Sequence, residues 1–275
     1  MIRNVLSIAG SDPSGGAGIQ ADLKTFAARG VYGMAVITAL TAQNTQGVSG
    51  VHLVPAHFVA EQITAVFADV RVDAVKIGMI ANAGIAAAVA DVMQDHPGIP
   101  VVLDPVMIAK GGAELLDPHA VSALVGRLLP LATLLTPNLP EAAFLLNEPV
   151  AQTREDMARQ ALQLQRLGAD SVLVKGGHLG GSTSPDVLVT GQDLIWFEAP
   201  RTTTSNTHGT GCTLSSALAA ELAKGATVQQ AMSVAKAYLA RAIALAGTLT
   251  VGSGHGPVQH FHDIWQHLAA EETCL

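Results

Sequence analysis

The run NTHGTGCTLSS at residues 206–216 combines small residues with a thiol at the start of an apolar, helix-periodic segment. Gly209, Thr210 and Gly211 leave the backbone N–H groups of a helix N-terminus open to a ligand, and such groups attract phosphate. Cys212 follows on the first turn, where chemistry on a phosphate group more often uses a carboxylate. These residues predict an anion site, with Cys212 as a catalytic group or, alternatively, as a small apolar core residue.

A lysine ends another apolar run, because Lys175 stands in VLVKGGH directly after buried-type residues. The burial of an ammonium group without an anion is costly, so a phosphate is the natural partner of Lys175. The alternative is a lysine whose ammonium group reaches the surface while its stem is buried.

Three oxygen-bearing side chains follow two further apolar runs. Asp104 stands in VLDPVM, and Asn138 and Glu141 stand three residues apart in TPNLPEA. If Pro140 lies in the first turn of a helix, this spacing places the amide and the carboxylate on one helix face. Mg²⁺ prefers one or two carboxylates together with water and phosphate oxygens, so Asp104, Asn138 and Glu141 predict a magnesium site. The alternatives are a helix N-cap for Asn138 and a helix-dipole partner for Glu141.

Two primary amides, Gln43 and Asn44, follow the apolar run MAVITAL. A primary amide both donates and accepts hydrogen bonds, so it suits a heteroaromatic ring with an amine beside a ring nitrogen. An ordinary turn residue is the alternative. The glycine-rich turn GSDPSGG after the first apolar run lets the backbone approach a small ligand, although it matches neither a Walker A loop nor a well-placed dinucleotide fingerprint.

Buried strands and amphipathic helices must position these side chains. Short apolar runs, typical of buried parallel strands, alternate with helical periodicity along the chain. We predict strands at NVLSIAG, MAVITAL, DAVKIGM, PVVLDPV, ATLLTP and DSVLVKGG, an antiparallel edge hairpin at DVLVT and LIWFEA, and helices that end before Gly30 or lie near 55–69, 82–95, 117–129, 138–146, 153–167, 210–224 and 228–246. This order predicts a doubly wound α/β fold, with a mostly parallel central sheet, helices on both faces and one domain over residues 1–275. Ligands of such sheets bind beyond the carboxyl ends of the strands, where the candidate residues lie.

The composition of the chain limits the classes of partner that it is expected to bind. The 275 residues carry a net charge of −7, and only 13% of them are charged. Without a Lys/Arg cluster, neither a nucleic-acid partner nor a membrane partner is expected. The two cysteines, Cys212 and Cys274, are too far apart in sequence to indicate a disulfide framework or a metal site, and the N-terminal apolar run is too short for a signal peptide. We therefore expect a cytoplasmic protein.

A phosphate cradle, a cation, magnesium ligands and a substrate turn are the components that phosphoryl transfer requires. The residues alone thus predict an ATP-dependent kinase for a small molecule. The competing class is a nucleotide or metabolite sensor with the same pocket. A sensor gains nothing from a titratable thiol beside the anion site, so Cys212 favours the enzyme.

Eight motifs in this order resemble hydroxymethylpyrimidine/phosphomethylpyrimidine kinases, a branch of the ribokinase superfamily: GSDPSGGAGIQADLKT, ITALTAQNTQGV, KIGM, LDPVMIAKGG, TPNLPEA, VKGGH, SPDVL and NTHGTGCTLSSALAA. The resemblance implies a ribokinase-like fold and the use of ATP and Mg²⁺. It also implies two reactions, the phosphorylation of 4-amino-5-hydroxymethyl-2-methylpyrimidine and then of its monophosphate in thiamine biosynthesis. A homodimer is expected on the same ground. The closest alternative is a pyridoxine/pyridoxal kinase, since vitamin B6 kinases share the Cys-type loop.

The resemblance also implies roles for individual residues. Gln43 would bind the aminopyrimidine edge, with Asp22, Gly10, Met79 and Val106 around the ring. Asn138 and Glu141 match the magnesium element N-x-x-E, with Asp104 nearby, and residues 209–212 match the anion hole. A helix N-terminus and nearby cations lower a thiol pKa, so we expect Cys212 to form a thiolate and to act as the general base. We expect His208 to shape the phosphate loop.

Overall fold

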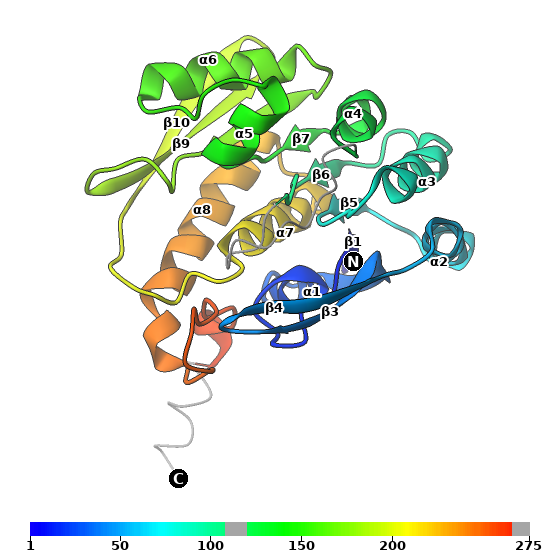
Figure 1. Ribbon diagram of the computed structural model, residues 1–275, viewed down its shortest axis with the longest axis horizontal. Helices are drawn as coiled ribbons and strands as arrows, with labels where there is room; N and C mark the ends of the chain where they lie inside the picture. The colour runs from blue at the N-terminus through cyan, green and yellow to red at the C-terminus, as the bar shows by residue number, and fades with distance from the viewer. Residues whose placement is uncertain (108–119, 266–275) are drawn as a thin grey trace.

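The computed structural model describes residues 1–107 and 120–265 of the chain. At its centre is a sheet of eight strands in the order β10-β9-β8-β7-β6-β5-β1-β2 (Figure 1). The strands are β1 (Asn4–Ala9), β2 (Tyr32–Ile37), β5 (Ala74–Ile77), β6 (Val101–Leu103), β7 (Leu134–Leu135), β8 (Ser171–Lys175), β9 (Thr183–Thr190) and β10 (Asp193–Pro200). β1 has β2 as its neighbour on one side and β5 on the other, so the strand order reverses at β1. In α/β sheets, ligands bind next to such a reversal point, beyond the carboxyl ends of the strands.

The sheet is parallel from β2 to β8, and only β9 and β10 run as an antiparallel hairpin at its edge. Both the parallel sheet and the edge hairpin were predicted, and both are confirmed. Its central strands are buried on both faces: in β1, Leu6 and Ile8 pack into one core and Val5 into the other. This two-sided burial explains why the strands read as continuous apolar runs.

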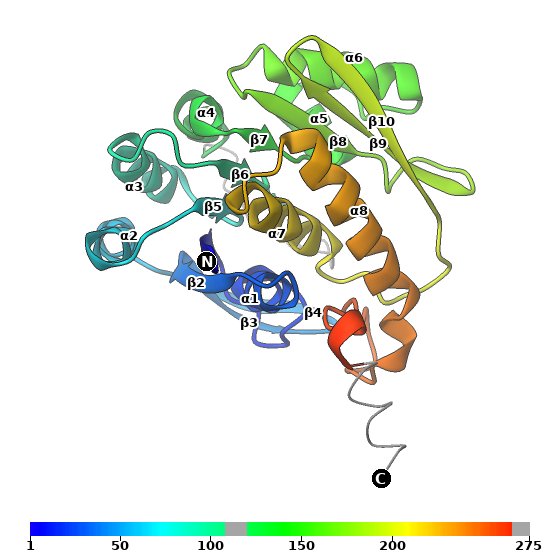
Figure 2. The same ribbon diagram turned by 180° about the vertical axis from the view of Figure 1, so that it is seen from behind.

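Helices cover both faces of the sheet, as Figures 1 and 2 show. The first face carries α1 (Gly18–Ala28), α7 (Thr210–Ala223) and α8 (Val228–Ala244). The second carries α2 (Ala56–Asp69), α3 (Ala83–Gln94), α4 (Ala120–Ala123), α5 (Leu139–Leu146) and α6 (Arg154–Gln165). The doubly wound α/β class is thus confirmed. In the described part of the chain, no helix combines the length and the apolar character needed to cross a membrane.

The predicted strand MAVITAL is wrong in one respect, because the chain changes sheets at Thr38. β2 ends at Ile37, and residues 39–44 form β3 (Ala39–Asn44), which pairs with β4 (Gly47–Leu53) in a separate two-stranded sheet. The buried Thr38 donates a hydrogen bond from Oγ1 to the Met79 carbonyl at 2.7 Å, and its backbone N–H bonds Ala9. Gln43 therefore lies on a strand of the hairpin rather than in a loop.

The helix predicted at 117–129 is also different. Residues 117–119 lie outside the described residues, and α4 ends at Ala123. A π-helical turn (Leu124–Leu128) and a 3₁₀ turn (Leu129–Leu131) follow. Pro130 lies in the 3₁₀ turn and has no N–H to donate, so an α-helical hydrogen bond cannot form there.

Candidate active site

The N-terminus of α7 packs closely against the glycine-rich turn that precedes α1. Gly209 is the N-cap residue and has φ 77°, in the left-handed region that favours glycine. A Cβ atom at Gly209 would lie only 1.8 Å from the Gly16 carbonyl oxygen, so the loop before α7 packs directly on the glycine-rich turn. The first turn of α7 contains Thr210, Gly211 and Cys212, whose backbone N–H groups have no acceptor within the helix, although the Thr210 N–H donates to the Thr207 carbonyl before it at 3.4 Å. A phosphate at this helix start stays a prediction.

A buried ion pair lies directly beside this helix start. The Lys175 ammonium donates a hydrogen bond to Asp104 Oδ1 at 2.8 Å, and a Cβ atom at Gly211 would lie 3.3 Å from Lys175 Nζ. Burial raises the pKa of Asp104, but Lys175 and Lys76 outweigh it and hold the pKa below its usual value. Burial alone would lower the pKa of Lys175, but the negative charges of Asp104 and Glu141 outweigh this effect and raise the pKa above its usual value. Both groups are charged at neutral pH, and the cation lies next to the open N–H groups.

Asn138 and Glu141 form a capping box at the start of α5. The Asn138 N–H donates to Glu141 Oε2 at 2.8 Å, and the Glu141 N–H donates to Asn138 Oδ1 at 2.9 Å. The cap and helix-start roles considered as alternatives are thus both present. Glu141 also accepts a backbone hydrogen bond from Met107, and its two oxygens keep lone pairs for a further ligand because a carboxylate has about four acceptor positions.

The donor set fits a divalent cation. Burial raises the pKa of Glu141 to about 7, and the nearby charge of Asp104 adds to this effect while Lys175 opposes it. Two neighbouring carboxylates repel each other when both are ionised, and a divalent cation bound by both would offset this repulsion. The amide oxygen of Asn138 completes an all-oxygen set of the kind that Mg²⁺ binds.

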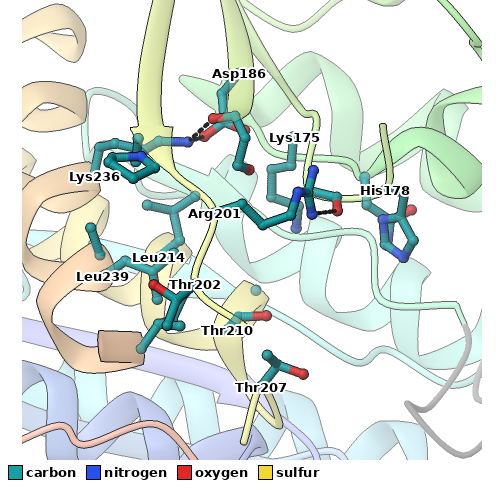
Figure 3. Close-up of a pocket in the computed structure, with 18 residues that line it drawn as sticks. Lys175, His178, Asp186, Arg201, Thr202, Thr207, Thr210, Leu214, Lys236 and Leu239 are labelled. Atoms are coloured by element: carbon teal, nitrogen blue, oxygen red, sulfur yellow. Dashed lines mark hydrogen bonds and ion pairs between the residues drawn. The ribbon is translucent and has the colours of Figure 1, made fainter. Parts of the chain in front are cut away.

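A cavity of about 350 Å³ opens beside α7 and α8 (Figure 3). Lys175, Thr210 and Gly211 line one part of it, and Leu214, Leu239, Ala240 and Ile243 give it an apolar wall. Its volume and mixed lining suit a small organic ligand that carries an anionic group. The apolar wall is formed by side chains along α7 and α8. Lys175 and the N-terminus of α7 lie at the carboxyl ends of the strands.

Two side chains at the cavity hold its loops in place, and sequence reasoning did not find either. The Arg201 guanidinium donates to the carbonyl oxygens of Gly177, Leu179, Gly181 and Thr183, and so fastens the loop between β8 and β9. The Lys236 ammonium donates to Asp186 Oδ2 at 2.6 Å and to the Ser184 carbonyl at 2.8 Å (Figure 3). No spacing in the sequence marks either contact, since each joins segments that meet only in the fold.

The residues expected around an acceptor ring occupy several positions. Gly10 and Met79 are in contact, because a Cβ atom at Gly10 would lie 2.4 Å from Met79 Cε. Val106 is half-buried after β6. Gln43 lines an open groove with the tip of the β3–β4 hairpin.

Asp22 lies deeper than expected. Its carboxylate is fully buried and accepts hydrogen bonds from Ser7, Ser216 and twice from Lys76. These four bonds occupy the acceptor capacity of a carboxylate, so Asp22 serves in this structure as the counter-ion of Lys76. A direct contact between Asp22 and a ring stays a prediction. The lone lysine inside the apolar run DAVKIGM was a signal that this buried pair existed.

Cys212 does not have the lowered pKa that the sequence predicted. Its side chain is half-buried, and burial raises the pKa of the thiol to about 11. Lys76 lowers the pKa, as expected of a nearby cation, but the carboxylates of Asp22 and Asp104 raise it. The expectation is wrong because tertiary packing buries the thiol and also brings two anions to the helix start.

His208 contacts the glycine-rich turn through its side chain. Its Nε2 lies 2.7 Å from Asp12 Oδ2, and its backbone N–H bonds the Gly256 carbonyl at 3.0 Å. Burial raises the pKa of Asp12, but hydrogen bonds from His208 and Ser14 outweigh it and hold the pKa below its usual value. The expectation that His208 shapes the phosphate loop agrees with this contact, whereas Asp12 was not recognised.

The family model and the curated relatives agree on one family. Residues 12–259 match the model of the phosphomethylpyrimidine kinase family. The chain is 55% identical to the hydroxymethylpyrimidine/phosphomethylpyrimidine kinase of Salmonella typhimurium, over 95% of this chain and 98% of that protein. The phosphomethylpyrimidine kinase of Clostridium difficile superimposes with a TM-score of 0.78 at 43% identity, covering 88% of this chain and 99% of that one. The pyridoxal kinase of Staphylococcus aureus in complex with AMP-PCP and pyridoxal has a TM-score of 0.88 at 34% identity, covering 96% and 95%.

Proposed function

The chain belongs to the phosphomethylpyrimidine kinase family, and we propose that it transfers phosphoryl groups from ATP in two successive steps of thiamine biosynthesis. The first acceptor is the hydroxymethyl group of 4-amino-5-hydroxymethyl-2-methylpyrimidine, and the second is the phosphate of the resulting monophosphate. The observation that carries the proposal is the buried Lys175–Asp104 pair beside the open N-terminus of α7 and next to a cavity. We take residues 1–275 as one kinase domain.

ATP binds in the cavity lined by α7, α8 and the β8–β9 loop. The adenine ring of ATP packs against Leu214, Leu239 and Ile243, and its phosphates lie toward Lys175 and Gly211. Lys175 neutralises phosphate charge, and the backbone N–H groups of residues 209–212 stabilise the charge on the transferring group. A nucleotide complex of a relative with this fold supports the assignment, since the S. aureus pyridoxal kinase is described in complex with AMP-PCP.

Asp104, Asn138 and Glu141 hold Mg²⁺ through their side-chain oxygens. When bound, the ion supplies charge neutralisation for the phosphates of the nucleotide. Glu141 must give up its proton to act as a ligand, which links the binding of the metal to pH. Lys175 keeps Asp104 ionised and oriented through the bond at 2.8 Å.

Cys212 accepts the proton of the hydroxymethyl group in the first step. In the second step the nucleophile is a phosphate oxygen that is already ionised, so no base is needed. A thiol with a pKa of about 11 is mostly protonated at neutral pH, and the first step is therefore limited by the thiolate fraction. The acceptor ring lies between Gln43 and the pair of Gly10 and Met79, with Val106 and Asp22 around it.

The experiment that tests this function measures ATP turnover with the hydroxymethyl pyrimidine, its monophosphate and pyridoxal side by side. We expect turnover of both pyrimidines. Turnover of pyridoxal alone would replace the proposal with a vitamin B6 kinase, a candidate supported by the likeness to the S. aureus pyridoxal kinase. Tight binding without any turnover would favour a sensor.

We also propose that the protein is a cytoplasmic homodimer with no nucleic-acid or membrane partner. Large apolar side chains on β2, β3, β4 and α2 are between 41% and 60% exposed: Tyr32, Leu40, Val51, Leu53 and Phe58. Apolar side chains grouped on neighbouring elements are typical of a protein interface. The net charge of −7 supports the absence of a nucleic-acid partner.

A further inference from the structure

One guanidinium group gathers the backbone carbonyls of the segment that joins β8 to β9, at the edge of the cavity. Arg201 directly follows β10, and its side chain donates hydrogen bonds to four carbonyl oxygens of this segment, those of Gly177, Leu179, Gly181 and Thr183. Figure 3 shows the Arg201 side chain extended across the cavity toward this segment. A planar guanidinium bonded on several sides has little freedom to move.

The sequence of the segment explains why its carbonyls can meet at one point. Residues 176–182 read GGHLGGS, and four of these seven residues are glycines. Gly181 has φ 109°, a conformation that side chains disfavour and glycine adopts readily. The Arg201 backbone N–H also donates to the Ser182 carbonyl at 2.9 Å. Both the backbone and the guanidinium of Arg201 are therefore tied to this segment.

The four bonds do not use every donor of the Arg201 side chain. A guanidinium has five N–H groups. Nε donates once, Nη2 donates twice, and Nη1 donates once, to Gly177 at 2.8 Å. Within the described part of the chain, one N–H of Nη1 is thus left without an acceptor. Gly177, which the same nitrogen bonds, lines the cavity, so the unused donor lies beside the cavity.

The charges around the cavity single out the same side chain. Three cationic side chains and one carboxylate line it: Lys175, Arg201, Lys236 and Asp186. Lys236 pairs with Asp186 at 2.6 Å, and Lys175 pairs with Asp104 at 2.8 Å. The partners of Arg201 among the described residues are carbonyl oxygens, which carry no net charge. The surplus positive charge of the cavity is therefore at Arg201, in a chain whose net charge is −7.

A bound nucleotide supplies the anion that this arrangement lacks. In the proposed function, the phosphates of ATP lie in this cavity, toward Lys175 and Gly211. The Lys175 side chain is only 14% exposed, whereas Arg201 is exposed at the mouth of the cavity. Resting on that function, we infer that Arg201 binds the phosphate chain of the nucleotide at the mouth of the cavity, through the unused N–H and the charge of a guanidinium that the four loop carbonyls hold in place.

The loop carbonyls lower the cost of this contact. A long side chain that becomes ordered only when it meets a ligand loses rotamer freedom, and this loss reduces the affinity. The four bonds order the guanidinium before the nucleotide arrives. A hydrogen bond from a guanidinium to a phosphate is charge-assisted and therefore strong. Because the transferring phosphate lies deeper, at Lys175 and the start of α7, Arg201 contributes to nucleotide affinity rather than to the rate of transfer.

The test compares two ligands that differ in their phosphates. The Kd for ADP with Mg²⁺ is measured by calorimetry without an acceptor, and the Kd for adenosine by ligand-detected NMR. For Arg201→Met we expect the Kd for ADP to rise about tenfold, as for the loss of one charge-assisted hydrogen bond, and the Kd for adenosine to stay the same. An unchanged Kd for ADP would overturn the inference. An equal loss for adenosine would also overturn it, because the residue would then only support the loop.

Steady-state turnover gives a second readout of the same variant. We expect the KM for ATP to rise by a factor similar to that for the Kd of ADP, while kcat at saturating ATP changes by less than about twofold, as for the removal of a contact made equally in the ground and transition states. A fall in kcat without a change in KM would contradict the inference.

Two further variants separate the charge of Arg201 from its position. Arg201→Lys keeps the charge, but its single nitrogen cannot bond all four carbonyls, so we expect it to retain only part of the affinity for ADP. A lysine variant that binds ADP as tightly as the unmodified protein would contradict the role of the carbonyls. Arg166→Met removes an exposed arginine at the end of α6, outside the cavity lining, and should leave the Kd for ADP unchanged. An equal weakening there would assign the effect to net charge and overturn the inference.

The proposed function fails by a different result. If the unmodified protein binds ADP and phosphorylates pyridoxal but neither pyrimidine, the proposed acceptor is wrong, and the Kd values of the Arg201 variants still decide the inference. An unmodified protein that binds no ADP would overturn both.

Discussion

Lys76 donates hydrogen bonds to both carboxylate oxygens of Asp22, at 3.0 and 2.9 Å, and neither side chain is accessible to solvent. The pair joins β5 to α1, and Ser216 of α7 donates to the same carboxylate at 2.7 Å. Burial lowers the pKa of Lys76, but the charge of Asp22 outweighs it and raises the pKa. Ser7 of β1 also donates to Asp22 Oδ2 at 2.6 Å, so two strands and two helices meet at one charged pair.

Asp22→Asn should be strongly destabilising, because it leaves the Lys76 charge buried without a partner. We expect the free energy of unfolding to fall by about 3–5 kcal/mol, measured by urea denaturation. The control is the double variant Asp22→Asn/Lys76→Met, which removes both charges. It should recover most of the loss, and a double variant as unstable as Asp22→Asn would show that the charge is not the cause.

Cys212→Ala should separate the two phosphorylation steps. Loss of a general base lowers a rate by about 10²–10⁴-fold, and we expect this for the first step only. The measurement is the formation of the monophosphate and of the diphosphate from separately supplied acceptors. Cys274→Ala is the matched control, since it removes the other cysteine of the sequence. A first-step rate close to that of the unmodified protein would remove Cys212 from this role.

The first step should also accelerate with pH. Because the pKa of Cys212 is raised to about 11, the thiolate fraction grows by about tenfold per pH unit across the neutral range. We expect kcat for the first step to rise between pH 6.5 and about 8.5, while the second step stays nearly flat. The Cys212→Ala protein should lose this slope, and a slope that persists would assign it to another group.

Glu141 should make stability depend on pH. Its pKa in the folded protein is about 7, above the ordinary 4.5, so the native state binds this proton more tightly than the unfolded state does. The stabilising contribution is complete below pH 4.5 and is lost as pH rises through 7, by up to about 3 kcal/mol. Glu141→Gln keeps an oxygen for the N-cap contact and should flatten the dependence in urea titrations without metal.

Mg²⁺ should reverse this trend in the unmodified protein. A metal ligand must be deprotonated, so we expect Mg²⁺ to raise the stability more at pH 8 than at pH 5. The Glu141→Gln protein should show a smaller stabilisation by Mg²⁺ at pH 8. An equal stabilisation in both proteins would place the metal elsewhere.

The proposed dimer should depend on the apolar surface of the β3–β4 hairpin. Leu40→Glu and Leu53→Glu introduce charges there, and we expect either variant to shift sedimentation from dimer to monomer, because burying an unpaired charge is costly. Leu162→Glu on α6 is the control, since Leu162 is similarly exposed at 39% on a different element. Unchanged sedimentation of both hairpin variants would exclude this surface.

The sequence by itself determined the fold class and most of the candidate site. Continuous apolar runs and helical periodicity are local properties, so they located most strands and helices of the main sheet to within a few residues. The rule that parallel strands end at one edge predicts that Asp104, Asn138 and Lys175 lie together, and the structure has them in contact through the Lys175–Asp104 bond and the Asn138–Lys175 bridge. The capping role of Asn138 was also readable, because a cap depends on a spacing of three residues.

Only the tertiary structure decided the properties that depend on distant segments. The pKa of Cys212 is raised because the fold buries the thiol, and because Asp22 and Asp104, which are far from it in sequence, lie near it in space. Asp12 and His208 are 196 positions apart, and no spacing indicates that they meet. The β3–β4 hairpin was missed because the change of sheet at Thr38 is set by its contacts with Met79 and Ala9 rather than by a local break in the apolar pattern. Electrostatics and hydrogen-bond partners depend on three-dimensional proximity, and a linear pattern carries that information only where neighbours in space are also neighbours along the chain.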